Sequence, residues 1–141
     1  MQNDNVKLKN FVAFNIPEFP KNINTVYIIF AIKDSNDCPF YVGETRNLRR
    51  RIGEYVVASF QAPTDFKVGE AIKYLHDKGY KITIRYKQTS DRKQEEKDII
   101  QHLKFSGVHL LNDLSGFDRK TADKTKEYEK IVNFLSKNFK F

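Results

Sequence analysis

Apolar and polar positions follow two different periods along the chain, and the changes of period mark the expected elements. Residues 25–33, TVYIIFAIK, are almost continuously apolar and rich in β-branched and aromatic side chains, as in a buried strand. A cluster of turn formers follows, and residues 39–44, PFYVGE, have the character of a second short strand. The two strands and the turn between them predict a β-hairpin. Residues 81–89, KITIRYKQT, alternate apolar with polar positions and predict a third, half-buried strand.

Apolar residues at helical spacing predict helices in the rest of the chain. The first helix is expected after Asn47, whose side chain suits an N-cap, and a break at residues 61–66 separates it from the next. Gly79 suits the end of this second helix. The second, third and fourth expected helices cover residues 68–79, 91–104 and 121–141, and residues 107–117 are expected to form a loop.

The order β-β-α-α-β-α-α predicts an α/β (α+β) domain with a small three-stranded sheet, mixed or antiparallel, flanked by helices. Residues 1–24 contain two prolines and many asparagines and are interpreted as an N-terminal arm. Residues 25–113 form the expected central domain, and residues 114–141 a helical extension packed on it. The expected apolar anchors of the arm are Phe11, Val12, Phe14, Ile16 and Phe19.

One acidic residue lies on the apolar side of the third expected helix. At about 100° per residue, Glu96 falls within roughly 15° of the centre of the apolar face, whereas Glu95 lies about 90° away. Glu96 is therefore expected to point into the protein, where an unpaired carboxylate is costly. Two interpretations stay open: an ion pair with Arg92 one turn earlier, or coordination of a divalent cation.

The stretch FYVGETRNLRRRIGEY combines a strand, a glycine and three successive arginines at one corner. Gly43 leaves room for a phosphate to approach the backbone, beside helix N–H groups that favour anions. Arg50 faces away from the apolar stripe of the helix and is interpreted as solvated. Arg49 and Arg51 flank the stripe on opposite sides, and the period alone does not choose between them.

Charge and composition narrow the class of protein only modestly. The net charge of +7 and a pI near 9.4 favour a polyanionic partner. A single cysteine, Cys38, excludes an internal disulfide and a cysteine-based zinc site. No segment approaches the roughly 18 apolar residues of a membrane span, and the N-terminus lacks the apolar run of a secretory signal. A cytoplasmic protein with no membrane contact is therefore expected.

An ordered set of short motifs resembles the GIY-YIG nuclease family over roughly residues 25–113. One departure is Thr25, which stands where the first motif of the family has glycine. The motifs are VYI at 26–28, YVG at 41–43, Asn47-Leu48, Arg51, EKDII at 96–100 and Asn112.

The resemblance implies four catalytic residues. Tyr27 would activate or orient the attacking water, and Tyr41 would contact the scissile phosphate. Arg51 would stabilise the charge that develops on the phosphate and favour the phenolate of Tyr27. Glu96 would hold one Mg²⁺ or Mn²⁺, which stabilises the leaving oxygen.

Five further residues are implied on the substrate side of the site. Gly43 would let the substrate backbone come close, and Asn112 would position the end of the site. Tyr55 would assist the base or pack beside it. Asn47 and Arg49 complete the set expected to bind substrate.

The expected function is that of a metal-dependent endonuclease that hydrolyses phosphodiester bonds in nucleic acid, with DNA as the expected substrate. Because one active site cuts one strand, a double-strand break requires a homodimer or two successive nicks. A non-catalytic nucleic-acid-binding module with a degenerate fold is the first alternative. The second is an interaction protein with phenylalanine-rich termini as its partner surface.

Overall fold

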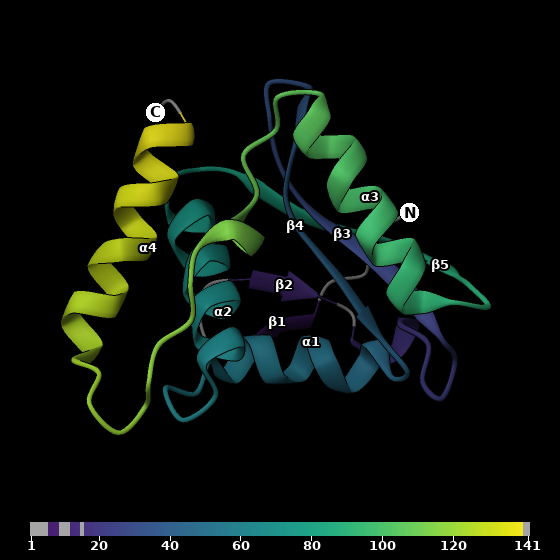
Figure 1. The fold of residues 1–141 in the computed structure, drawn as a ribbon, viewed down its shortest axis with the longest axis horizontal. Helices are drawn as coiled ribbons and strands as arrows, with labels where there is room; N and C mark the ends of the chain where they lie inside the picture. Colours follow the sequence, from purple (N-terminus) through teal and green to yellow (C-terminus); the bar gives the residue numbers. More distant parts are fainter. Residues whose placement is uncertain (1–5, 9–11, 15, 140–141) are drawn as a thin grey trace.

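The computed structural model describes residues 6–8, 12–14 and 16–139, and its centre is a three-stranded sheet (Figure 1). The strands lie in the order β4-β3-β5, and both neighbouring pairs are antiparallel. The α+β fold is thus confirmed, and the sheet is the antiparallel one of the two arrangements expected. The strands are β3 (Thr25–Lys33), β4 (Asn36–Thr45) and β5 (Lys81–Gln88).

Helices α1 (Leu48–Val57) and α2 (Pro63–Asp77) cover one face of the sheet and bury Tyr27, Ile29 and Ala31 of β3. Helix α4 (Lys124–Asn138) packs on α2 (Figure 1). Helix α2 begins five residues before the predicted residue 68. Its proline stands in the first turn, where no backbone N–H is needed, so this proline starts the helix instead of interrupting it.

Helix α3 (Arg92–Phe105) covers the opposite face and packs on a smaller cluster around Val26, Val42 and Leu110. The chain then passes around the outer edge of β4 through the short 3₁₀ helix η2 (Leu111–Asp113). Leu110 is buried on the α3 side and Leu111 in the core beneath α1 and α2. This segment therefore joins the two faces of the sheet at strand β4.

The N-terminal arm contains more regular structure than the sequence predicted. Strands β1 (Val6–Leu8) and β2 (Val12–Phe14) form a small antiparallel sheet, followed by the 3₁₀ helix η1 (Ile16–Glu18). Three residues are too few to show a strand period, which explains why the pattern missed these elements. Of the expected anchors, Ile16 and Phe19 pack against the core. The side chains of Phe11, Val12 and Phe14 lie outside the described part of the chain.

None of the helices in the described ranges combines the length and the apolar character needed to span a membrane.

Candidate active site

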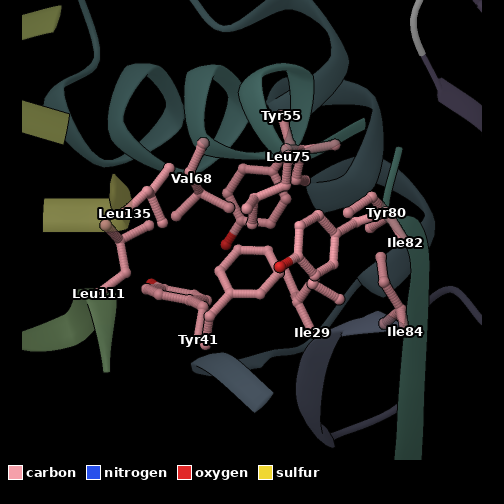
Figure 2. Packing of buried hydrophobic residues seen from close by; sticks show 14 of the residues in the cluster. Ile29, Tyr41, Tyr55, Val68, Leu75, Tyr80, Ile82, Ile84, Leu111 and Leu135 are labelled. Carbon is pink, nitrogen blue, oxygen red and sulfur yellow. The ribbon is translucent and has the colours of Figure 1, made fainter. Parts of the chain in front are cut away.

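Three tyrosines from β3, β4 and α1 meet in the core beneath α1 and α2. The hydroxyl oxygens of Tyr27 and Tyr55 lie 2.5 Å apart, and the Tyr41 ring meets the Tyr55 ring edge-on at 6.3 Å. Tyr27 and Tyr55 are each 1% exposed, and Tyr41 is 8% exposed. Figure 2 shows Tyr41 and Tyr55 within the packed core. The structure thus brings the two predicted catalytic tyrosines together and makes Tyr55 the direct partner of Tyr27.

Burial raises the pKa of all three phenols above its ordinary value. For Tyr27, loss of hydration is the main cause and the proximity of Tyr41 adds to it, while a hydrogen bond with Tyr55 and the charge of Arg51 lower the pKa only in part. Burial and Tyr55 raise the pKa of Tyr41 in the same way. Arg51 therefore favours a phenolate, as expected, but burial outweighs it. At neutral pH the raised pKa keeps the Tyr27 hydroxyl protonated.

Arg51 lies over the tyrosine cluster, with its guanidinium carbon 4.7 Å from the centre of the Tyr55 ring. One of its nitrogens, Nη1, is 2.7 Å from the Glu54 carboxylate and 2.5 Å from that of Asp65 on α2. The side chain is 23% exposed. These contacts hold the Arg51 guanidinium over the Tyr55 ring and between two carboxylates.

Gly43 stands directly opposite Tyr27 in the antiparallel pair of β3 and β4. A Cβ atom at Gly43 would lie 2.3 Å from both Cζ and the hydroxyl oxygen of Tyr27. The space that the glycine leaves is thus occupied by the tyrosine ring. This packing requires a glycine whether or not a phosphate approaches the backbone here.

Arg49 points away from the tyrosine cluster and toward the N-terminal segment. Its Nε donates to the carbonyl of Phe19 at 3.0 Å and its Nη2 to the carbonyl of Pro17 at 2.8 Å. Arg49 therefore fixes η1 and the residue that follows it, and its expected contact with substrate stays a prediction. Of the two flanking arginines, only Arg51 lies at the tyrosine cluster. Arg50 is 73% exposed, in agreement with its interpretation as solvated.

Two asparagines use their side chains to fix the backbone around the site. Asn47 is the N-cap of α1, as predicted, and its Oδ1 accepts from the Arg50 amide at 3.1 Å. Asn112 pairs with the Val42 backbone, donating from Nδ2 at 2.7 Å and accepting through Oδ1 at 3.0 Å. Since both ends of its amide are engaged, Asn112 suits positioning β4 between Tyr41 and Gly43 rather than contacting substrate.

Glu96 lies on α3, on the other side of β4 from the tyrosines. Its side chain is half-buried rather than enclosed, because α3 covers only part of the sheet face and buries none of its residues fully. Burial first, and then the nearby carboxylate of Glu44, raise the pKa of Glu96, and its charge in turn raises the pKa of Tyr41. Glu96 and Tyr41 therefore interact electrostatically.

Arg92 and Glu96 do not form the ion pair that was one of the two interpretations open from the sequence. Arg92 instead bonds Glu44 of β4 at 2.6 Å and the side-chain oxygen of Asn24 at 2.7 Å. Within the described ranges, Glu96 has no ion pair or hydrogen bond of its own. Of the two interpretations left open by the sequence, the ion pair with Arg92 is not formed, and coordination of a divalent cation remains.

Sequence reasoning missed three carboxylates around the site. Glu54 follows Arg51 at i+3, a spacing that local rules can find. Asp65 and Glu44 meet their arginines only through packing, 14 and 48 residues away in the chain. These contacts had no signal in the local pattern.

Glu96 offers one carboxylate ligand for a divalent cation. Among the described residues, no three His, Cys, Asp or Glu side chains form a group that could hold a metal ion. Mg²⁺ often binds through only one or two carboxylates, keeps several waters and takes further oxygens from substrate phosphates. A half-buried Glu96 with no ion pair or hydrogen bond to another described residue fits such an open site.

The chain matches the family model of the GIY-YIG catalytic domain over residues 24–108. Since this match covers more than half of the 141 residues, the chain belongs to the GIY-YIG family. Neither a search of curated proteins nor a search of solved structures gave a match. The fold and the family together define the class as a nuclease catalytic domain.

Proposed function

We propose that this protein is a metal-dependent endonuclease that hydrolyses phosphodiester bonds in DNA. The observation that carries the proposal is the placement of two groups on opposite sides of edge strand β4. The tyrosines and Arg51 lie on one side, and Glu96, without a partner in the described ranges, lies on the other. Charge stabilisation and a cation ligand, two of the needs of phosphodiester hydrolysis, are thus available beside the same strand.

Each side chain has a distinct part in the proposed water attack. Arg51 stabilises the charge on the phosphoryl oxygens, held in place by Glu54 and Asp65. Tyr41, the most exposed of the three tyrosines, meets the water and phosphate, and Tyr27 acts as a neutral hydroxyl that orders them. Glu96 would hold Mg²⁺ or Mn²⁺, and the bound cation would supply charge stabilisation for the leaving oxygen.

The test is the nicking of supercoiled plasmid in Mg²⁺ or Mn²⁺ by the wild type and by Glu96→Gln. We expect the variant to lose about 10³-fold in rate, equivalent to about 4 kcal/mol of transition-state stabilisation. The matched control is Glu95→Gln, one residue away, because Glu95 instead bonds Lys87 and Thr89. This control should retain the wild-type rate.

The other outcomes separate the remaining hypotheses. Equal cleavage by the wild type and Glu96→Gln would place the activity at another site or in a contaminant. Salt-dependent DNA binding with no turnover on duplex, single-stranded DNA or RNA would support the non-catalytic binding module. Nicked circles that precede linear product indicate single-strand cuts, whereas direct linear product supports a homodimer.

A further inference from the structure

A polar recess lies at the end of the sheet where β3 begins and β5 ends. It is lined by residues 22–24, Arg46, residues 88–90 and Arg92, and we call it the arginine recess. Arg46 comes from the connection between β4 and α1, and Arg92 from the first turn of α3. The recess therefore adjoins the elements that carry both halves of the candidate active site.

The chemistry of the lining suits the backbone of a nucleic acid. Seven of the eight lining residues are polar, Ile23 is the exception, and no acidic residue is among them. Arg92 is fixed by Glu44 and Asn24. Arg46 is exposed and has no ion pair or hydrogen bond from its side chain within the described ranges. Cations, amides and hydroxyls of this kind make most protein contacts to phosphate and sugar.

The position of the recess relates it to Glu96. Arg92 precedes Glu96 by four residues on α3, an axial offset of about 6 Å. Arg92 thus places one wall of the recess about one helical turn from Glu96 along α3.

We propose that the arginine recess binds the sugar-phosphate backbone of a nucleic acid beside the catalytic residues, with Arg46 as the phosphate contact. This inference rests on the proposed nuclease function and extends its substrate contact beyond the catalytic residues. Such a contact carries no base information, so it favours binding without sequence preference.

The test measures binding of a short fluorescent DNA duplex to Glu96→Ala protein over a range of salt concentrations, so that cleavage does not interfere. Adding Arg46→Gln should weaken binding about 3- to 10-fold and reduce the salt slope by about 0.9, the value for one phosphate contact. Arg46→Lys should retain the slope. The matched control is Arg119→Gln, an exposed arginine before α4, and it should retain the affinity and the slope of the Glu96→Ala parent.

Unchanged affinity and slope for Arg46→Gln, in a protein whose wild type nicks DNA, would overturn the recess while leaving the nuclease intact. An equal loss from Arg119→Gln would also overturn it, because the effect would then reflect net charge alone. Failure of the wild type to bind or cut any nucleic acid would instead overturn the function on which the recess rests.

Discussion

The two sides of strand β4 differ in how tightly their functional groups are held. On the side of α1 and α2, Tyr27 and Tyr55 are buried in the core, and their hydroxyls are hydrogen-bonded to each other. On the side of α3, Glu96 is only half-buried and has no ion pair or hydrogen bond in the described ranges. The tyrosine side therefore depends on the packing of the fold, while the Glu96 side can exchange ligands without disturbing the core. Substitutions should affect stability and activity together on the first side, and on the second should affect mainly activity, with only a slight change in stability.

The largest effect on stability is expected from Gly43→Ala. The new methyl group would overlap the Tyr27 ring, and overpacking of this kind costs about 1–3 kcal/mol of the free energy of unfolding. The control is Gly53→Ala within α1, where an added Cβ has no neighbour within 4 Å. It should stabilise the protein by about 0.5–1 kcal/mol through helix propensity. Urea denaturation measures both, and equal stability of the two variants would refute the proposed contact.

A smaller effect is expected from removing the hydroxyl pair at the centre of the cluster. Tyr27→Phe and Tyr55→Phe should each lose about 1 kcal/mol, because each leaves the other hydroxyl buried without its partner. The double variant should lose less than the sum of the two losses. Tyr128→Phe on α4, at a tyrosine that is 37% exposed, is the control with little change. Strict additivity in a double-mutant cycle would show that the hydroxyls do not interact.

The comparison also shows how far the sequence could predict the structure. The three central strands and the helices have clear periods, so their existence and order were predictable, as was the N-cap Asn47. The strands of the N-terminal arm were missed because they are only three residues long. The start of α2 was misplaced because Pro63 was taken as a break.

Within the site, local patterns could predict residue types but not partners. The helical period could not decide whether Arg49 or Arg51 points toward the tyrosines. Only the packing of the η1 segment against Arg49 and of α2 against Arg51 distinguishes them. The same holds for Arg92, whose partner is Glu44 on β4 instead of Glu96 one turn away. Tertiary packing decides these pairs, and it has no local signature in the sequence.

The smallest expected effect concerns the pH dependence of stability, to which the neighbouring carboxylates of Glu96 and Glu95 should contribute in opposite directions. Burial and Glu44 raise the pKa of Glu96, so its ionised form destabilises the fold. The stability that protonated Glu96 contributes is therefore present below the ordinary glutamate pKa and is lost as pH rises through the raised pKa of the folded state. Hydrogen bonds from Lys87 and Thr89 lower the pKa of Glu95, so its stability is present above the ordinary pKa and is lost as pH falls through the lowered one.

At neutral pH, Glu96→Gln should therefore raise the melting temperature slightly and Glu95→Gln should lower it slightly, and both differences should fade in acid. Mg²⁺ should stabilise the wild type more than Glu96→Gln, because an ion that binds the folded state adds to its stability. Thermal melts across pH, with and without Mg²⁺, measure all three effects. A lower melting temperature for Glu96→Gln without metal would mean that Glu96 has a stabilising partner in the folded protein. The contrast between the tightly packed side of β4 and the side on which Glu96 can exchange ligands would then be wrong.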